Sequence, residues 1–483
     1  MKDRKEQIER IRHFEDVFDS VTEAVRRVND SIDRLEQLAP QIEELNMYYT
    51  GSEWKEDFED DEAGLIPHEL KRGVLSEDGV YDLLDELREL KERIPRLAEA
   101  SPEVPSTGSA VEKKPMKVLL LSCSTGEGHN HCAKAVREAL NSLEVQTDFF
   151  DMLYLFGQPG PIGIEQLLNV ISTKAPDLFG LMYKAGEKVS ALGVTSPVYL
   201  VNTTYGRKLC DLINEKGYDA VVCSHLFPME TLTFIRKRYE LKTRCYGILS
   251  DYTCIPFLPE TELDGYFLPH EKVRAQCMSA GIPADKLIVT GMPVSDAFRS
   301  DMTKETARKT LGIDASAKMY LVMTGGIGCG DAVSLCGKLM QLAGDDTLLC
   351  VLAGRNQELL DSLNKKYSGD RRVMAVPFTD KVSVYMRAAD VLLSKAGGIS
   401  SAEAAVANVP LVHTMMIPGV ETLNAEFFSG LGMSLMAENF DEAARYADRI
   451  VYDERTGKGI IEAQKTHMPP NGAERIARYI VEV

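Results

Sequence analysis

Apolar residues recur at two different spacings, which divide the chain into a helical first part and a longer part of strands and helices. Over residues 5–39, and again over 79–97, apolar side chains fall three or four positions apart, the spacing of one helix face. Pro40 ends or kinks the first of these helices. From residue 117 onward, short continuous apolar runs alternate with amphipathic stretches, which predicts buried parallel strands joined by helices.

The two N-terminal helices are predicted to form a helical hairpin over residues 1–98. The segment between them is acidic and turn-rich, and it holds Trp54, the single tryptophan of the chain. The near-heptad spacing also allows these helices to form a coiled-coil homodimer. Residues 99–116, EASPEVPSTGSAVEKKPM, have the composition of a flexible linker.

The pattern from residue 117 onward predicts two doubly wound units. The first begins with the run KVLLLSC at residue 117, followed by a helix and by VQTDFFD, DAVVCSH, RCYGILSD and KLIVTG. The second begins with KMYLVMTGG at residue 318, followed by TLLCVLAG, RRVMAVPF, DVLLSKAGG, PLVH and MSLMA. We therefore predict an α/β fold with two Rossmann-like domains, residues 117–303 and 304–483, that face a cleft. The last helix, ERIARYIVEV, is expected to cross back to the first of them.

Residues 152–205 differ in composition from the rest of the first Rossmann-like domain. Many apolar and aromatic side chains are interleaved there with Lys174, Lys184 and Lys188. This composition is typical of a lipid-facing interfacial segment. An additional pair of core helices accounts for it equally well, and the sequence leaves both possibilities open.

Charge and hydropathy limit the kinds of molecule and membrane that the protein is expected to contact. Residues 1–100 hold 28 acidic and 15 basic side chains for a net charge of −13, whereas the remaining residues hold 45 and 40 for a net charge of −5. Nucleic-acid binding is excluded because it requires a basic surface, but a local basic patch on the balanced part could contact an anionic membrane. No run of 18 apolar residues and no signal peptide is found, so a cytoplasmic, peripheral protein on the inner face of the membrane is expected. The ten cysteines lack metal-site spacing and are expected to be buried free thiols.

The segment 394–424, SKAGGISSAEAAVANVPLVHTMMIPGVETLN, suits a phosphate and a sugar bound together. Two glycines before a helix allow backbone N–H groups to approach a diphosphate, and Lys395 adds a full positive charge. Glu403 can accept hydrogen bonds from ribose hydroxyls, while Glu421 and Asn424 are spaced to bind sugar hydroxyls. The alternative interpretation is an ordinary strand–turn–helix unit.

This segment resembles the donor-binding signature of the monogalactosyldiacylglycerol synthase and processive diacylglycerol glucosyltransferase family, which is related to MurG. Further matching pieces follow in the family's order: GEGH at 126–129, SDYT at 250–253, GMPV at 291–294, TGGIG at 324–328 and AGRN at 353–356. Ala396 replaces a proline common in the family, and Val420 replaces a sugar-contacting glutamine, which leaves the sugar open. The first hundred residues resemble a small bacterial domain family without known function.

The resemblance implies the GT-B fold and a set of site residues. Catalysis is expected at His129 and Asp251, and acceptor binding at Gly126, Gly128 and His225. Donor binding is expected from Gly326, Gly328, Arg355, Asn356, Phe378, Thr379, Lys395, Gly397, Gly398, Glu403, Gly419, Glu421 and Asn424.

His129 is the residue expected to act as a base. At a helix N-terminus the dipole disfavours the imidazolium, so the ring stays neutral and can accept the proton of an acceptor hydroxyl. Asp251 could orient His129 or act as the base itself. For His129, Asp251 and His225 alike, a capping or otherwise satisfied polar role remains the alternative.

The predicted activity is an inverting transfer of a hexose from a UDP-sugar to a membrane-lipid hydroxyl, with diacylglycerol as the expected acceptor. No metal or other cofactor is expected, since a lysine and a helix dipole can stabilise the departing UDP. The alternatives are MurG-like transfer of N-acetylglucosamine to a polyprenyl-linked acceptor, a UDP-sugar epimerase, and a nucleotide-sugar-binding regulator without catalysis.

Overall fold

The structure is a computed structural model of the whole chain. It describes residues 116–123, 127–152, 205–323, 331–414 and 416–483, together with α2 (Ser52–Glu62) and scattered positions between 38 and 83. The chain divides into two compact units, residues 1–112 and 113–483. The predicted helices at 5–39 and 79–97 and the segment 152–205 lie outside the described residues, apart from a few positions.

Helix α2 corrects one prediction for the N-terminal unit. The acidic segment around Trp54 was expected to be turn-rich, but its central part is an 11-residue α-helix. Trp54 stacks on Phe58 one turn later, with ring centroids 5.1 Å apart, and its indole N–H donates to the carbonyl of Val74 at 2.8 Å. A helix brings residues four apart onto one face, so this aromatic pair favours the helix over turns.

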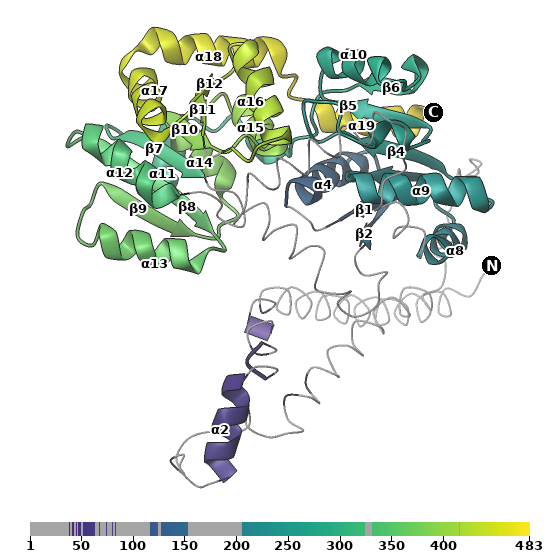
Figure 1. Cartoon of the computed structure of the whole chain (residues 1–483), viewed down its shortest axis with the longest axis horizontal. Helices are drawn as coiled ribbons and strands as arrows, with labels where there is room; N and C mark the ends of the chain where they lie inside the picture. The colour runs from purple at the N-terminus through teal and green to yellow at the C-terminus, as the bar shows by residue number, and fades with distance from the viewer. Residues whose placement is uncertain are drawn as a thin grey trace, which may run out of the picture. The chain divides into compact units, whose positions relative to one another are not determined.

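The first sheet of the second unit has six parallel strands in the order β2-β1-β3-β4-β5-β6 (Figure 1). Their bounds are β1 Lys117–Ser122, β2 Gln146–Asp151, β3 Ala220–Cys223, β4 Arg244–Ile248, β5 Gly265–Leu268 and β6 Leu287–Val289. Strands β3 and β5 are buried along their whole length, as expected of a parallel sheet covered by helices on both faces. The strand order reverses between β1 and β3, where such folds bind ligands.

The second sheet also has six parallel strands, in the order β12-β11-β10-β7-β8-β9. Their bounds are β7 Lys318–Met323, β8 Thr347–Gly354, β9 Val373–Pro377, β10 Val391–Ser394, β11 Leu411–His413 and β12 Leu435–Met436. This is the strand order of a Rossmann fold, with its reversal between β7 and β10. The prediction of two doubly wound domains is therefore confirmed.

Helices flank both sheets (Figure 1). In the first domain they are α4 Glu127–Asn141, α8 Gly206–Lys216, α9 Leu226–Arg238 and α10 Glu271–Ser279, with short 3-10 turns at Leu258–Glu260, Ala284–Lys286 and Asp296–Phe298. In the second they are α11 Lys304–Leu311, α12 Ala332–Leu342, α13 Gln357–Lys366, α14 Val382–Ala388, α15 Gly398–Val406, α16 Val420–Gly430, α17 Phe440–Tyr452 and α18 Glu454–His467. Among the described residues, no helix combines the length and hydropathy needed to cross a bilayer.

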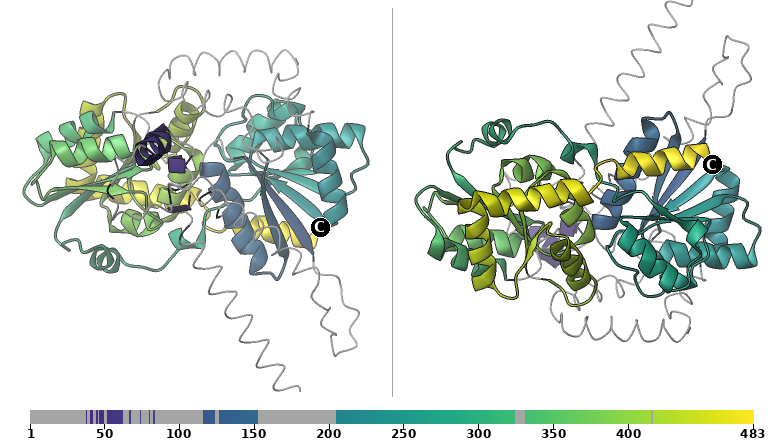
Figure 2. Two further views of the ribbon diagram at one scale, coloured as in Figure 1. Left: turned by 90° about the horizontal axis from the view of Figure 1, so that it is seen from below. Right: turned by 90° about the horizontal axis from the view of Figure 1, so that it is seen from above.

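The last helix, α19 (Gly472–Glu482), returns to the first domain, as predicted (Figure 2). It packs on α4, and the ring of Tyr479 lies 6.0 Å from that of Tyr246 and 5.5 Å from that of Phe267. A side chain at Gly472 would place its Cβ only 2.3 Å from the carbonyl oxygen of Met292, so glycine permits this close return. The chain therefore passes twice between the two domains.

The cysteines match the prediction of free thiols. All nine cysteines that the structure describes are free, and eight of them are buried. Most of them contribute to the apolar cores as small hydrophobic residues.

Candidate active site

The first-domain half of the candidate site lies where the strand order reverses between β1 and β3. Helix α4 begins at Glu127, a few residues beyond the end of β1, and places His129 in its first turn. The backbone carbonyl of Ser224, directly after β3, lies 2.8 Å from His129 Nδ1. The hydroxyl of Ser250, beyond β4, lies 3.2 Å from the same nitrogen.

These contacts determine the tautomer of the neutral His129 ring. A carbonyl oxygen can only accept, so Nδ1 must carry the proton and donate it to Ser224. The other ring nitrogen, Nε2, then holds the lone pair. Nε2 is therefore the ring nitrogen that could accept a proton, and the role of His129 as a base stays a prediction.

The surroundings of His129 favour its neutral form. Burial lowers the pKa of the His129 imidazole, while the negative charge of Asp251 and the hydrogen bond to Ser224 act in the opposite direction. The sequence predicted a neutral ring and attributed it to the helix dipole. In the structure burial is the largest cause, and His129 contacts the segments that follow β3 and β4.

A cavity of about 20 Å³ adjoins His129, Ser250 and Asp251 and has room for about one water molecule. A lipid hydroxyl with its glycerol backbone does not fit into this space.

His225 is placed next to His129, with ring centroids 4.5 Å apart. Its Nδ1 accepts the backbone N–H of Phe227 at 3.1 Å and so caps the N-terminus of α9. Burial and the adjacent His129 hold the pKa of His225 well below its ordinary value. The capping alternative is thus realised, while the role of His225 in acceptor binding stays a prediction.

Asn424 joins the two domains at the other predicted catalytic residue. Its amide nitrogen donates to Asp251 Oδ1 at 2.9 Å and to the carbonyl of Ala396 at 3.1 Å, and its oxygen accepts from the N–H of Tyr252 at 2.7 Å. The side chain of Asn424 is fully buried. Its expected contact with a sugar hydroxyl stays a prediction, whereas in the structure it holds Asp251 against the second domain.

The second-domain half of the site is the turn between β10 and α15. Gly397 is the residue before the helix and makes no side-chain cap, so the first N–H groups of α15 have no side-chain acceptor there. The Lys395 ammonium lies 2.7 Å from Glu421 Oε1, and Glu421 Oε2 accepts the N–H of Ile417 at 2.9 Å. Glu421 thereby fixes the position of Lys395 beside a helix N-terminus.

Gly398 permits the two domains to touch. A Cβ at this position would lie 2.0 Å from the backbone oxygen of Ser250 and 3.1 Å from Asp251 Oδ1. A Cβ at Gly128 would lie at an ordinary contact distance of 3.5 Å from the side chain of Ile399. The need for glycine at 398 in this structure therefore comes from the first domain, in addition to the predicted approach of a diphosphate.

Glu403 also takes part in a contact between the domains. It is buried, and its Oε1 lies 3.4 Å from Nδ1 of His131 on α4. A ribose bound to Glu403 would compete with His131 for this carboxylate. Its ribose role stays a prediction.

Other predicted donor residues lie at the carboxyl ends of β8 and β9. The Arg355 guanidinium lies 4.9 Å from the centre of the Phe378 ring, which is 59% exposed, so a core role for Phe378 is excluded. Asn356 caps α13, and the hydroxyl of Thr379 accepts the N–H of Lys381 at 3.1 Å.

Gly419 precedes α16 with a φ of 114°, a conformation that favours glycine. Gly126, Gly326 and Gly328 lie outside the described residues. Within the described part of the chain, no group of three or more histidine, cysteine, aspartate or glutamate side chains could hold a metal ion.

Sequence reasoning missed three positions that shape the site. Ser224 and Ser250 act on His129 through a carbonyl and a hydroxyl, and the sequence signal for them was only their place directly after strands β3 and β4. His131 gave a weaker signal, because a contact 272 positions away with Glu403 depends on how the domains meet.

Comparison with known proteins agrees with this arrangement. Residues 129–294 match the family model of monogalactosyldiacylglycerol (MGDG) synthase, and residues 324–441 match that of the glycosyltransferase family 28 C-terminal domain. The protein is a glycosyltransferase. Residues 11–96 of this glycosyltransferase match a domain of unknown function, DUF4298.

Its curated relatives include the processive diacylglycerol beta-glucosyltransferase of Bacillus cytotoxicus, 26% identical over 374 residues. The enzyme of the same name from Bacillus thuringiensis is 24% identical over 373 residues, and each match covers 76% of this chain and 93% of the relative. The predicted family resemblance is confirmed.

Solved structures confirm the GT-B fold. Acinetobacter baumannii MurG gives a TM-score of 0.51 at 13% identity, covering 76% of this glycosyltransferase and 100% of that chain. UDP-GlcNAc 2-epimerase from Neisseria meningitidis bound to UDP-GlcNAc gives 0.51 at 14% identity with the same coverage, and S. aureus MnaA with UDP gives 0.52 at 13% over 76% and 96%. At these identities the likeness concerns the fold alone, which transferases and epimerases share.

Proposed function

We propose that this glycosyltransferase moves a hexose from a UDP-sugar to the free hydroxyl of diacylglycerol, with inversion and without a metal ion. The acceptor oxygen bonds to the anomeric carbon as the bond from that carbon to the UDP oxygen breaks. The hydroxyl proton passes to His129 Nε2, and the bonding electron pair leaves with UDP.

The observation that carries the proposal is the hydrogen bond from His129 Nδ1 to the Ser224 carbonyl. It leaves Nε2 as the accepting atom, and burial keeps the ring neutral near physiological pH. A general base of this kind is what a single-displacement transfer requires of the acceptor side.

The transfer also requires stabilisation of the leaving diphosphate, and the turn at 395–398 is suited to this role. The N-terminus of α15 offers backbone N–H groups and partial positive charge, and Lys395 lies in the same turn. These groups can take the place of a metal ion at the leaving oxygen. Metal independence is part of the proposal.

The acceptor and the linkage are proposed by similarity to the relatives named diacylglycerol beta-glucosyltransferases. A β-linked product formed from an α-linked nucleotide sugar requires inversion. Action on diacylglycerol implies peripheral contact with a membrane, which we place at the inner face. Val420, at the first position of α16, leaves the choice of hexose open.

One assay tests the proposal. Labelled UDP-glucose, UDP-galactose and UDP-N-acetylglucosamine are each incubated with diacylglycerol vesicles in the presence of EDTA, and the lipids are separated. The proposal predicts a labelled glycosyldiacylglycerol from one hexose donor. Conversion of the free nucleotide sugar without any glycolipid would instead indicate an epimerase, and UDP-sugar binding without turnover a regulator.

A further inference from the structure

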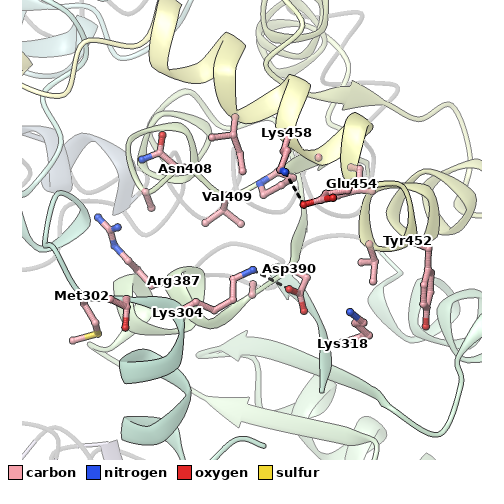
Figure 3. Close-up of a pocket in the computed structure, with 18 residues that line it drawn as sticks. Met302, Lys304, Lys318, Arg387, Asp390, Asn408, Val409, Tyr452, Glu454 and Lys458 are labelled. Carbon is pink, nitrogen blue, oxygen red and sulfur yellow. Dashed lines mark hydrogen bonds and ion pairs between the residues drawn. The ribbon is translucent and has the colours of Figure 1, made fainter. Parts of the chain in front are cut away.

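A second cavity lies at the edge of the second sheet opposite to the candidate active site. Its volume is about 660 Å³, within the range of about 300–1,000 Å³ typical of ligand pockets. Lys318 begins β7, Asp390 precedes β10 and Pro410 precedes β11, so the cavity opens at the amino ends of these strands. Helix α18 and residues 302–304, which lead from the first domain into α11, form its other walls (Figure 3).

The charged residues of the cavity are mainly basic. Lys304, Lys318, Arg387 and Lys458 line it, against Asp390 and Glu454. Lys304 pairs with Asp390 at 2.8 Å, and Lys458 pairs with Glu454 at 2.6 Å. Among the lining residues, the positive charges of Lys318 and Arg387 are therefore in excess, while the negative charge of Asp301, outside the lining, also acts on Arg387.

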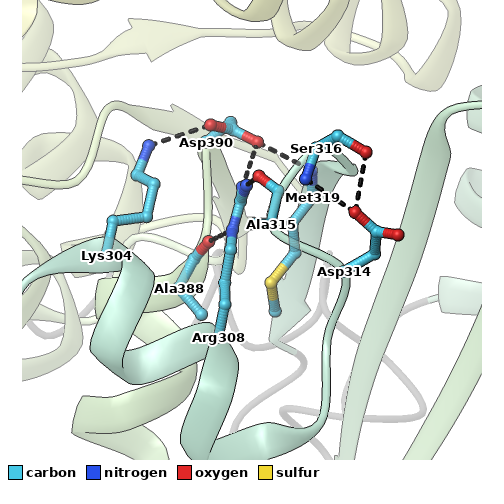
Figure 4. A network of polar contacts seen from close by, with 8 residues as sticks. All are labelled: Lys304, Arg308, Asp314, Ala315, Ser316, Met319, Ala388 and Asp390. Carbon is cyan, nitrogen blue, oxygen red and sulfur yellow. Dashed lines mark hydrogen bonds and ion pairs between the residues drawn. The ribbon is translucent and has the colours of Figure 1, made fainter.

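Asp390 is already engaged by three donors other than these two cations. Its Oδ2 accepts from Arg308 Nη2 at 2.7 Å and from the N–H of Met319 at 2.8 Å, while Oδ1 takes the Lys304 ammonium (Figure 4). Arg308 is itself buried and bound to the carbonyls of Ala388 and Ala315. This network neutralises Asp390 from within the domain.

The Arg387 guanidinium is only partly engaged by hydrogen bonds within the protein. Its Nη2 donates to the carbonyl of Phe298 at 2.7 Å, but its buried Nε–H has no hydrogen-bond partner among the described residues. Likewise, no other residue in the described part of the chain forms an ion pair or hydrogen bond with the Lys318 ammonium. Guanidinium groups bind phosphate oxygens well, and the Arg387 side chain is among those that line the cavity.

The remaining lining is apolar. Val409, Pro410 and Ile461 contribute aliphatic surface, and Tyr452 an aromatic ring that is 54% exposed. A ligand that fits this cavity thus carries a strong negative charge on a partly apolar body. A phosphate monoester is close to doubly charged at neutral pH, which balances the two excess cations.

We propose that this cavity binds a phosphate monoester, with Arg387 as its anchor and Lys318 as the second cation. The site is separate from the donor cleft, because it lies at the amino ends of the strands rather than at their carboxyl ends. The phosphate could belong to a soluble ester or to the headgroup of a lipid, and both present the same group to Arg387.

The test is calorimetry of the full chain with glycerol 3-phosphate, beside co-sedimentation with vesicles of phosphatidylcholine mixed with phosphatidate. Arg387→Gln is expected to weaken binding by about 10-fold or more, and Lys318→Gln by several-fold. Lys338→Gln, which removes one charge on α12 outside the cavity, and Lys395→Gln in the donor turn should leave this binding unchanged. If Arg387→Gln lowers the melting temperature, the proposal is judged from the binding measured with Lys318→Gln alone.

Each outcome decides the proposal. Binding of glycerol 3-phosphate that depends on Arg387 or Lys318 supports a soluble ester, and the same dependence seen only with vesicles supports a lipid headgroup. Absence of binding to both probes overturns the proposal. Loss of binding in Lys395→Gln but not in the cavity variants overturns it as well, because the phosphate then occupies the donor cleft.

Discussion

The two halves of the candidate active site use different chemical groups. In the first domain, a histidine side chain is fixed by a carbonyl and a hydroxyl beneath the strand ends. In the second domain, a glycine turn presents backbone at a helix N-terminus, beside a lysine held by a glutamate. One half is suited to proton transfer, and the other to binding an anion.

This difference predicts whether a substitution should change the chemical step or the affinity for the donor. Changes in the first half should alter the chemical step, whereas changes in the second half should alter donor affinity. Several contacts join the halves, among them Asn424 with Asp251, His131 with Glu403 and Gly398 with Ser250, so some residues should affect both. The predictions below use this contrast.

The largest effect is expected at His129. His129→Ala should lower kcat by about 10²–10⁴-fold, because the transition state loses its general base. UDP affinity, measured by calorimetry, should change little. His467→Ala, a histidine outside the site, serves as the control. A kcat within a few-fold of the unmodified protein would shift the role of base to Asp251.

Gly398→Ala should separate closure of the domains from donor chemistry. Its Cβ would lie 2.0 Å from a backbone oxygen that cannot rotate away, so the observed contact with Ser250 must open. A cost of about 3 kcal/mol corresponds to roughly 150-fold less of the closed form and a similar loss of kcat/KM.

Gly397→Ala is the matched control, since its Cβ would meet only the rotatable hydroxyl of Ser400 at 3.1 Å. Equal activities of the two alanine variants would show that this domain contact is not needed for turnover.

Glu403→Ala tests the donor half alone. UDP binding should weaken by about 1–3 kcal/mol, the worth of charge-assisted hydrogen bonds to ribose hydroxyls. Calorimetry measures this directly, with Glu426→Ala on the exposed side of α16 as the control. Unchanged UDP affinity would remove Glu403 from the donor site and leave it only its contact with His131.

Asp251→Asn should give the smallest change, a shift of the pH profile. The neutral His129 is the active form, so kcat should fall as pH drops through a His129 pKa that burial places below its ordinary value. The Asp251 charge raises this pKa, so its removal should move the acid limb to lower pH, by about one unit or less. The asparagine oxygen can still accept from Asn424. A shift to higher pH would contradict the assigned electrostatics.

Much of the fold followed from local patterns. Runs such as KVLLLSC and TLLCVLAG are mainly apolar, as strands covered on both faces are, and they match β1 and β8 closely. The glycine turn before α15 was also evident, because two adjacent glycines directly before a helix-forming run are typical of a tight turn into a helix. By contrast, the acidic stretch of α2 was misread as turn-rich, although it is a helix in which Trp54 stacks on Phe58 four positions later.

The sequence could not predict those features of the site that depend on contacts between residues far apart in the chain. The neutrality of His129 was predicted, yet its main cause is burial beneath strand ends far apart in sequence. Asn424 was read as a sugar ligand from its spacing, although its three hydrogen bonds reach residues on both domains. The basic cavity at the opposite edge gave no signal, because its walls come from five separate segments.

The anomeric configuration of the product tests the central claim most directly. The full chain is incubated with an α-linked UDP-hexose and diacylglycerol in EDTA, and the purified glycolipid is examined by proton NMR. A single displacement assisted by His129 predicts a β-linked glycosyldiacylglycerol. An α-linked product, or the absence of glycolipid until a divalent metal ion is added, would contradict the account.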